Sequence, residues 1–282
     1  MISVKSYAKI NIALNVVGKT EKNYHLLDSV VLPIALHDTI IIQNLKNGVE
    51  TYVTIDDFSQ GSIEYNICTF AIDKLASMYG FNNKFRVYIH KVIPMQAGLG
   101  GGSSNAAFTM KAVIKQLKLN VSDEELLDIA KNLGADVPFF IKCQPSRMRG
   151  IGEQLDPITV KKNYYVLIVK PFDGCSTAEV FKQADELEIK TGNIEDVIKA
   201  LETGDDDLLA SSIVNSLEDA AIKLVPEIKH IKELLYSFGL KIVGMTGSGS
   251  SVVALSQDKK LLKKIASELE NTYQVELTKV LK

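Results

Sequence analysis

The sequence has few of the residues that build covalent or metal-centred sites. It contains three cysteines, Cys68, Cys143 and Cys175, which lie far apart and form no Cys-x-x-Cys spacing. This pattern argues against a disulfide framework and against a thiolate metal site, so we expect reduced thiols in the core or near the surface. The four histidines also lack a ligand-like spacing, and we expect no metal bound through histidine.

The sequence also lacks long apolar runs and a large excess of charge. No run approaches the roughly 20 apolar residues that a membrane span requires, and the first residues lack the regions of a signal peptide. We therefore expect a cytoplasmic protein. The formal net charge is −2, from 32 basic and 34 acidic residues. No general attraction to nucleic acid or to anionic lipid follows, so we expect local recognition of a small-molecule partner.

The length of 282 residues favours two domains. A basic stretch without a regular pattern covers residues 143 to 163, and a new strand is expected at 164 to 170. We therefore predict one domain over residues 1–158 and a second over 159–282. An apolar run from 30 to 42, interrupted by Pro33, suggests two strands, and residues 46 to 62 resemble a loop. Helices are expected over 66 to 79, from 103 or 104 to 117, and after Ser122.

The most informative stretch is the glycine-rich segment 94–107, Pro-Met-Gln-Ala-Gly-Leu-Gly-Gly-Gly-Ser-Ser-Asn-Ala-Ala. Its glycines permit positive φ and close approach of a ligand to the backbone. The helix expected directly after them directs unpaired N–H groups and a positive dipole end to the same place. Strand, glycine loop and helix in this order indicate a phosphate-binding site.

Four more places carry polar residues that chemistry could use, and each also has a structural explanation. Lys9 and Asn11 share the polar face of an alternating strand, which could simply be wetted by solvent. Asn66 stands where a helix cap is expected. Asp136 lies between Gly134 and Pro138, where an ordinary Asp turn would also fit. Residues 246–250, Thr-Gly-Ser-Gly-Ser, could be a tight hairpin or a second phosphate-facing loop.

The glycine segment does not fit two common nucleotide motifs. It lacks the Lys-Ser/Thr pair of the P-loop, and its glycine spacing and following helices do not match a dinucleotide-binding turn. Three motifs together do match a family: Ala8-Lys9-Ile10-Asn11, the run from Gly98 to Ala107, and Thr246 to Ser250. Their order and coverage of nearly the whole chain mean that the sequence resembles the GHMP kinases.

The resemblance implies an α+β protein with the two-domain GHMP kinase fold. The N-terminal domain would be similar to the second domain of ribosomal protein S5, and the C-terminal domain would be ferredoxin-like. ATP would bind with Mg²⁺, which its phosphates would hold with a contribution from Ser104. The ATP-binding residues that the resemblance implies are Asn66, Pro94, Gly98, Leu99, Gly100, Gly101, Gly102, Ser103 and Ser104.

Within the family, Tyr24-His25 and the run Gly134 to Pro138 indicate the members that phosphorylate a cytidine diphosphate-linked polyol. These act on the methylerythritol phosphate route to isoprenoid precursors, and the acceptor would be the 2-hydroxyl of the methylerythritol group. Tyr24 and Phe181 would sandwich the cytosine, and His25 would read its edge. The substrate-binding residues that the resemblance implies are Asn11, Tyr24, His25, Asn105, Thr177, Phe181, Gly247 and Ser248.

The catalytic pair that the resemblance implies is Asp136 and Lys9. Asp136 would take the proton from the acceptor hydroxyl. Lys9 would lie beside it, keep the carboxylate ionised, and stabilise charge on the γ-phosphoryl group. The motifs supply phosphate-binding backbone, one lysine and one aspartate, without a cysteine or histidine nucleophile, so direct transfer is the economical mechanism.

Several positions depart from the family pattern. Tyr7 replaces a usual proline, Asn23 a usual glycine and Leu26 an expected acidic residue, while the segment 143–149 is unusual. Asn tolerates the left-handed conformation, so the turn at Asn23 can survive. The departures leave open a different acceptor, such as homoserine, a mevalonate derivative or a sugar. The sequence is also compatible with a ligand sensor without catalysis and, more distantly, with an NAD-linked enzyme, and it leaves open whether the protein is a monomer or a homodimer.

Overall fold

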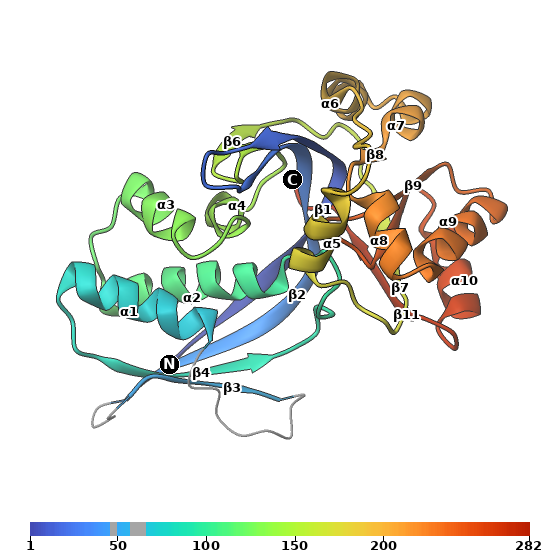
Figure 1. The fold of residues 1–282 in the computed structure, drawn as a ribbon. Helices are drawn as coiled ribbons and strands as arrows, with labels where there is room; N and C mark the ends of the chain where they lie inside the picture. Colours follow the sequence, from blue (N-terminus) through green and yellow to red (C-terminus); the bar gives the residue numbers. More distant parts are fainter. Residues whose placement is uncertain (46–49, 57–65) are drawn as a thin grey trace. The chain divides into compact units, whose positions relative to one another are not determined.

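The computed structural model describes residues 1–45, 50–56 and 66–282, which group into two compact units (Figure 1). The first unit consists of Met1–Ala8, His37–Pro94 and Gly100–Cys143, and the second of Lys9–Leu36, Met95–Leu99 and Gln144–Lys282. Strands β1 (Ile2–Lys19) and β2 (His25–Leu45) contribute residues to both units. The division into domains 1–158 and 159–282 stays a prediction, because the two units are assembled from interleaved stretches of chain.

The sheet of the first unit is built around β4 (Lys84–His90). This strand pairs antiparallel with β2 and parallel with β3 (Tyr52–Ile55), so that Val87 lies opposite both Ile42 and Val53. Alternate residues of these strands are buried, which is the period-two pattern of a sheet with one face on the core. β1 lies beside β2, which gives the strand order β3-β4-β2-β1 for this part of the sheet.

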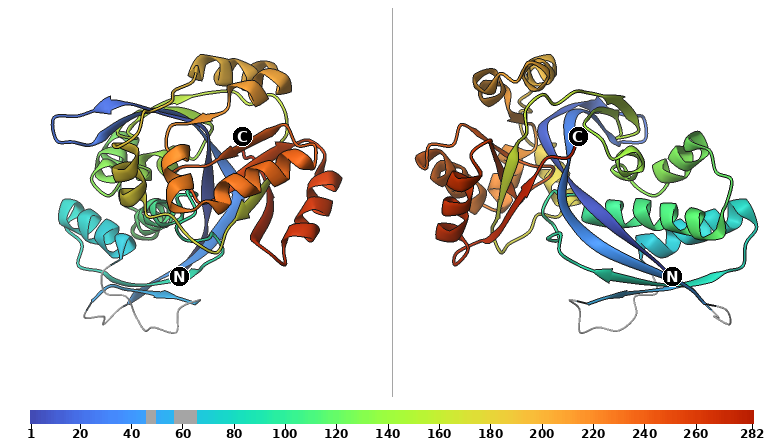
Figure 2. Two further views of the ribbon diagram at one scale, coloured as in Figure 1. Left: turned by 45° about the vertical axis from the view of Figure 1, so that its right-hand side comes forward. Right: turned by 180° about the vertical axis from the view of Figure 1, so that it is seen from behind.

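Four helices complete the first unit: α1 (Ile67–Tyr79), α2 (Gly101–Leu117), α3 (Asp123–Lys131) and α4 (Val137–Lys142). α1 and α2 lie side by side over one face of the sheet (Figure 2). Both expected caps are present. Asn66 accepts a hydrogen bond from the N–H of Cys68 and forms a capping box with Thr69, and Ser122 forms the expected capping box with Glu125.

The second unit contains a four-stranded antiparallel sheet in the order β11-β7-β10-β9, which is the order of a ferredoxin-like domain, as predicted. Its strands are β7 (Tyr165–Lys170), β9 (Ile242–Met245), β10 (Val252–Ser256) and β11 (Gln274–Lys279). The helices of this unit are α5 (Thr177–Ala184), α6 (Ile194–Thr203), α7 (Asp206–Ser212), α8 (Glu218–Leu224), α9 (Glu227–Ser237) and α10 (Lys259–Leu269).

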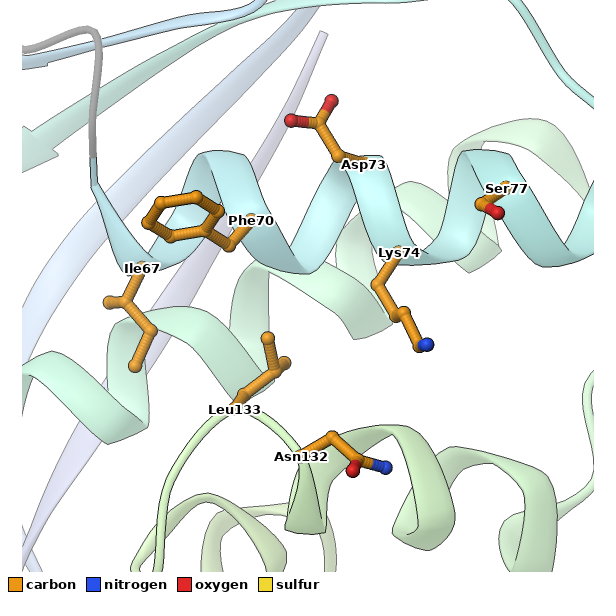
Figure 3. Close-up of a pocket in the computed structure, with 7 residues that line it drawn as sticks. All are labelled: Ile67, Phe70, Asp73, Lys74, Ser77, Asn132 and Leu133. Atoms are coloured by element: carbon orange, nitrogen blue, oxygen red, sulfur yellow. The ribbon is translucent and has the colours of Figure 1, made fainter.

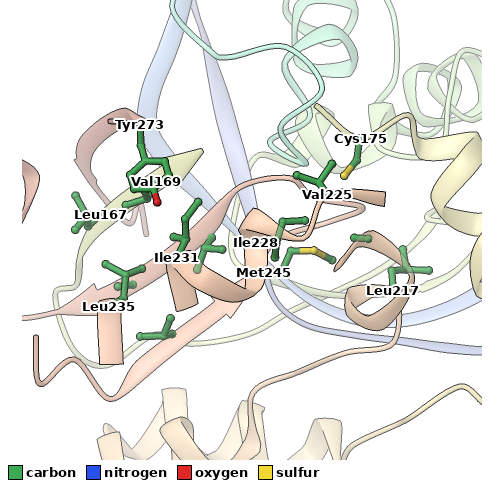
Figure 4. Close-up of a cluster of buried hydrophobic side chains, with 14 of the residues drawn as sticks. Leu167, Val169, Cys175, Leu217, Val225, Ile228, Ile231, Leu235, Met245 and Tyr273 are labelled. Carbon is green, nitrogen blue, oxygen red and sulfur yellow. The ribbon is translucent and has the colours of Figure 1, made fainter. Parts of the chain in front are cut away.

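The core of the second unit lies between this sheet and its helices. Leu167 and Val169 of β7 belong to the same buried cluster as three residues of helix α9, namely Ile228, Ile231 and Leu235 (Figure 4). Complete burial of one such side chain contributes about 1.5–3 kcal/mol. The remaining strands are the hairpin β5 (Ser146–Gly150) and β6 (Gln154–Pro157), which extends from β2, and β8 (Val214–Asn215), which pairs parallel with β1.

Three predictions of regular structure were wrong. Residues 30 to 42 belong to one continuous strand, the 21-residue β2, and Pro33 does not interrupt it. The Pro33 carbonyl accepts a hydrogen bond from the N–H of Leu281. Part of the expected loop 46–62 is strand β3, and its residues 46–49 and 57–62 lie outside the described residues. The stretch 143–163 contains the β5–β6 hairpin, whose pairing with β2 supplies order that its composition did not indicate.

The polar face of β1 differs from the simplest expectation for an alternating strand. Lys9, Asn11 and Asn15 are 2–5% exposed, so this face is not wetted by solvent. Asn15 exchanges two hydrogen bonds with the backbone of Gly192, which satisfies its amide in the interior. Within the described part of the chain, no helix is both long enough and apolar enough to cross a membrane.

Candidate active site

The glycine segment ends at the N-terminus of α2, which begins at Gly101, earlier than expected. Gly100 is the N-cap residue with φ of 70°, and the first helical hydrogen bond runs from the N–H of Ser104 to the Gly100 carbonyl. The N–H groups of Gly101, Gly102 and Ser103 precede this bond, and the N-cap residue, a glycine, has no side chain to cap the helix. An exposed, uncapped end of a 17-residue helix is a favourable site for a phosphate group.

Gly102 has no atom of the described chain within 4 Å of the position that a Cβ would occupy, its own helix aside. Packing of the protein therefore does not require a glycine here. Gly101 differs, because its Cβ would lie 2.9 Å from the Lys91 Nζ and 3.1 Å from Ile93. Glycine therefore suits the two adjacent positions for different reasons. At position 101 it leaves room for the side chains of Lys91 and Ile93, and at position 102 it leaves open space at the end of the helix.

A buried ion pair supports the chain just before the glycine segment. Asp38 has no exposed side-chain surface, and its carboxylate accepts hydrogen bonds from the N–H groups of Val92 and Ile93 at 2.8 Å and from Lys91 Nζ at 2.7 Å. Lys91 Nζ also donates to the Ile93 carbonyl. A charged acceptor of three hydrogen bonds fixes the turn after β4, so the approach to Pro94 is rigid.

We expect Asp38→Asn to destabilise the protein by about 2 kcal/mol, because the amide removes the charge that faces the buried ammonium of Lys91. The free energy of unfolding from denaturant titration measures this loss. The double variant Asp38→Asn, Lys91→Met is expected to be less destabilised than the sum of the two single variants, since the paired charges are removed together. Strict additivity would contradict the coupling.

The second glycine loop, residues 246–250, connects β9 and β10, so it is a hairpin connection. It also contacts the first glycine segment through the backbone. The carbonyl of Gln96 accepts hydrogen bonds from the N–H groups of Ser250 and Cys175, both at 3.4 Å. A Cβ on Gly98 would lie 2.0 Å from the Thr246 carbonyl oxygen. The close approach of these two loops therefore requires glycine at position 98, where φ is 71°.

Lys9 lies at the centre of a buried polar cluster formed by β1 and the second glycine loop. Its Nζ donates to the Asn11 Oδ1 at 2.5 Å, and its backbone N–H donates to the Leu99 carbonyl at 3.0 Å. The Asn11 N–H donates to the Thr246 Oγ1, and the Asn11 side chain donates to the Ser29 Oγ. This cluster places a lysine ammonium next to the contact of the two loops, in surroundings with little water to screen it.

Asp136 is a half-buried residue at the N-cap position of α4. Its side chain makes no capping hydrogen bond to that helix within the described structure, so an ordinary capping role does not account for it. The turn before it starts at Gly134, whose carbonyl accepts from the N–H of Val137. A Cβ on Gly134 would lie 3.9 Å from the Ser103 Oγ, so this turn adjoins the N-terminus of α2.

Ser104 and Asn105 have internal partners. Both are buried, and the Ser104 hydroxyl donates to the Tyr7 carbonyl at 2.6 Å and lies 2.7 Å from the Ser6 Oγ. Ser6 in turn donates to the Asn105 Oδ1 at 2.8 Å. These bonds attach α2 to β1. They do not offer the Ser104 hydroxyl as an open metal ligand, and its assignment to ATP and Mg²⁺ stays a prediction.

The residues that were predicted to bind the cytosine base lie close to helix α5. His25 stacks on Phe181 with ring centroids 4.5 Å apart and planes inclined by 29°. Tyr24 is 61% exposed, so the stack in this structure is formed by His25, and the sandwich of Tyr24 and Phe181 stays a prediction. Asn23 takes the left-handed conformation with φ of 64°, as expected. Thr177 and Ser248 are joined by a hydrogen bond of 2.9 Å.

A cavity of about 440 Å³ lies beside the start of α1 (Figure 3). Ile67 and Phe70 of α1 line it opposite Leu133, and Lys74 and Asn132 stand at its polar side. Ile67 follows Asn66, one of the residues predicted to bind ATP. An apolar hollow of this size with a few polar groups suits a nucleobase, although Asn66 itself is used as the cap of α1.

The described side chains form neither a disulfide nor a cluster of metal ligands. All three cysteines are free thiols. Burial raises the pKa of Cys68 to about 12 and the pKa of Cys143 and Cys175 to about 11, so none is a reactive thiolate near neutral pH. Among the residues that the structure describes, no group of three or more His, Cys, Asp or Glu side chains could hold a metal ion.

Some residues that shape the site were not identified by the sequence analysis. Asp38 and Lys91 support the entry to the glycine segment. Asn215 donates to the carbonyls of Met245 and Gly247 and so fixes the second glycine loop. Asp185 binds His25. These are common polar residues outside any motif, and only their long-range partners distinguish them from surface residues.

The chain matches two family models, described as the GHMP kinases N terminal domain over residues 66–144 and the GHMP kinases C terminal over residues 197–275. A 4-diphosphocytidyl-2-C-methyl-D-erythritol kinase from Clostridium kluyveri is 35% identical over 261 residues, which cover 90% of this chain and 91% of the relative. A protein of the same name from Clostridium novyi is 36% identical over 260 residues, or 90% of each chain.

A solved structure of a 4-(cytidine 5'-diphospho)-2C-methyl-D-erythritol kinase is also similar. It superposes with a TM-score of 0.82 at 26% sequence identity, and the match covers the whole of both chains. Similarity of sequence and of fold therefore extends over almost all of this chain, including both glycine loops.

Proposed function

Because the chain belongs to the GHMP kinase family, we propose that it transfers the γ-phosphoryl group of ATP to the 2-hydroxyl of 4-diphosphocytidyl-2-C-methyl-D-erythritol. The observation that carries the proposal is the shared name of relatives at 35–36% identity that align over nine-tenths of the chain. The reaction is a step on the methylerythritol phosphate route to isoprenoid precursors.

The local chemistry supports a phosphoryl transfer. The uncapped N-terminus of α2 supplies N–H donors for phosphate oxygens, and the open space at Gly102 lets an oxygen approach the backbone closely. We assign the adenine to the cavity beside Asn66 (Figure 3). Thr177 and Ser248, with the second glycine loop, are assigned to the acceptor.

In the proposed reaction the 2-hydroxyl oxygen attacks the γ-phosphorus while the bond from that phosphorus to the bridging oxygen of ADP breaks. Asp136 accepts the proton of the hydroxyl. Lys9 stabilises the negative charge on the transferred group, and Asn11 holds its ammonium in place. The hydroxyl loses its proton late in a loose transition state, so a carboxylate of ordinary basicity is a sufficient base.

The proposed reaction uses ATP as its magnesium complex. The Ser104 hydroxyl is buried and hydrogen-bonded to the Tyr7 carbonyl, so it does not fit the role of a metal ligand. Mg²⁺ would be held by the phosphates themselves, where it neutralises part of their charge. The residues of this chain that then act on the phosphates are the N–H donors of α2 and the Lys9 ammonium.

An acceptor panel tests the proposed function. The purified protein with MgATP is expected to phosphorylate 4-diphosphocytidyl-2-C-methyl-D-erythritol at least about 100-fold more efficiently, in kcat/KM, than homoserine, mevalonate derivatives or simple sugars, because only the first has groups that a nucleotide pocket can bind. ADP release and mass spectrometry of the product measure the transfer. Preference for any other member of the panel would overturn the assigned acceptor.

A second candidate from a different class is a ligand sensor on the same fold. ATP binding without turnover on every acceptor would favour it. The buried Lys9 ammonium favours the kinase, because a sensor has no need to hold a desolvated cation beside two glycine loops.

A further inference from the structure

The contacts of His25 extend beyond its stack on Phe181. The ring lies at the start of β2, with 15% of its side chain exposed, and its Nε2 lies 2.7 Å from the Asp185 Oδ1. Asp185 is the C-cap residue of α5, four residues after Phe181. The other carboxylate oxygen, Oδ2, lies 2.7 Å from the Lys19 Nζ. The C-terminal half of α5 therefore contacts the imidazole twice: Phe181 stacks on its face, and Asp185 bonds to its edge.

The chemistry of the carboxylate decides which ring nitrogen carries the proton. Hydrogen bonds from Lys19, and then from His25, lower the pKa of Asp185, so its carboxyl group is ionised near neutral pH. An ionised carboxylate only accepts hydrogen bonds, so Nε2 must be the donor. In a neutral imidazole the other nitrogen, Nδ1, is then an acceptor. Lys19 binds the second carboxylate oxygen and so holds the orientation of the carboxylate toward the ring.

We propose that Asp185, held by Lys19, fixes the tautomer of His25 and thereby selects a cytosine base over a uracil base. This inference rests on the proposed function, which supplies a cytidine diphosphate-linked acceptor. On the edge of cytosine the only donor is the 4-amino group, since N3 and O2 are acceptors. An acceptor at Nδ1 can pair with that amino group, whereas uracil presents a carbonyl oxygen at the same place.

The stack on Phe181 makes this edge contact compatible with a sandwiched base. A base that bonds to Nδ1 lies close to the plane of the imidazole. That plane is inclined by only 29° to the Phe181 ring, so the base lies in a layer nearly parallel to Phe181. Tyr24, which is largely exposed, can then cover the opposite face. Asp185 and Lys19 are positioning residues in this arrangement, because they act through His25.

Two measurements test the proposal on the intact protein. Nitrogen-15 NMR of the imidazole, assigned by the loss of the signal in His25→Gln, is expected to show a protonated Nε2 and a bare Nδ1. Calorimetric titration with cytidine diphosphate and uridine diphosphate is expected to show tighter binding of the cytidine nucleotide. In Asp185→Asn that preference is expected to fall by about 10-fold, because an amide can donate to Nε2 as well as accept from it.

The matched control is Asp219→Asn, which removes an exposed carboxylate paired with Lys190 in the same unit and is expected to bind like the wild type. Asp185→Glu keeps the charge and is expected to retain more of the cytidine preference than the amide. An unchanged preference in Asp185→Asn, or a protonated Nδ1 in the wild type, would overturn this inference alone. Wild-type protein that binds neither nucleotide would overturn the proposed function and this inference together.

Discussion

Replacing Asp136 by asparagine is expected to lower kcat by about 100-fold or more, because the amide cannot take the proton of the acceptor hydroxyl. The melting temperature is expected to change by only a few degrees, because asparagine has nearly the same volume and keeps one side-chain oxygen that accepts hydrogen bonds. Steady-state phosphorylation and thermal unfolding of the same preparation measure both quantities. Full activity of the variant would remove Asp136 from the mechanism.

The matched control for this prediction is Asp128→Asn in α3. Asp128 is an exposed aspartate of the same unit, paired with Lys131, and its loss is expected to change neither kcat nor the melting temperature. A comparable fall of kcat in both variants would indicate a general effect of charge. A fall in Asp136→Asn alone would locate the effect at the turn that adjoins the N-terminus of α2.

Lys9→Met tests the other half of the proposed catalytic pair. Its kcat is also expected to fall by about 100-fold or more, because the ammonium that stabilises the transferring group is gone. Unlike Asp136→Asn, it is expected to lower the melting temperature, since the buried Asn11 Oδ1 loses its donor. If both residues act in one step, the double variant loses much less than the product of the two single effects.

Local motifs gave the most reliable part of the site. The glycine segment and the caps at Asn66 and Ser122 depend on residues close together in the sequence, so their structure could be predicted. The contact between the two glycine loops joins Gly98 to Thr246. The composition indicated two glycine-rich loops, but only the family resemblance assigned both loops to one kinase.

Periodicity was a weaker guide where both sides of a strand are covered. The alternation around Lys9 and Asn11 predicted a strand correctly but left its polar face undecided between solvent and interior. The burial of that face depends on Ser29 and Thr246, which bond to Asn11 from distant parts of the chain. The same limit explains the β5–β6 hairpin, whose polar sequence is ordered by pairing with β2.

The positioning residues could not be predicted because their partners are remote and their types are common. Asp185 contacts His25 across 160 positions of sequence, and Asp38 contacts Lys91 to Ile93 across 53 to 55. An aspartate near the end of a helix or strand is usually a solvated surface group. Burial distinguishes Asp38, and the short contact with His25 distinguishes the exposed Asp185; only the folded chain provides either observation.

The glycines of the first loop are expected to respond differently to the same small change. Gly98→Ala places a methyl group 2.0 Å from the Thr246 carbonyl oxygen, at a φ of 71° that alanine adopts poorly. The two loops must separate, so we expect a loss of stability of about 2–4 kcal/mol, seen as a fall in melting temperature of roughly 5 °C or more. Activity is expected to fall by about 100-fold or more, because the loop and the Lys9 cluster shift together.

Gly102→Ala is the matched variant, since it adds the same methyl group four residues later. No atom of the described chain outside its own helix lies within 4 Å of the new Cβ, and alanine favours a helix over glycine by roughly 1 kcal/mol. The melting temperature is therefore expected to hold or rise slightly. The KM for ATP is expected to rise about 10-fold, because the methyl group occupies the space assigned to a phosphate oxygen. An unchanged KM would move the phosphates away from this end of α2, and an unchanged melting temperature in Gly98→Ala would show that the contact between the loops is not tight.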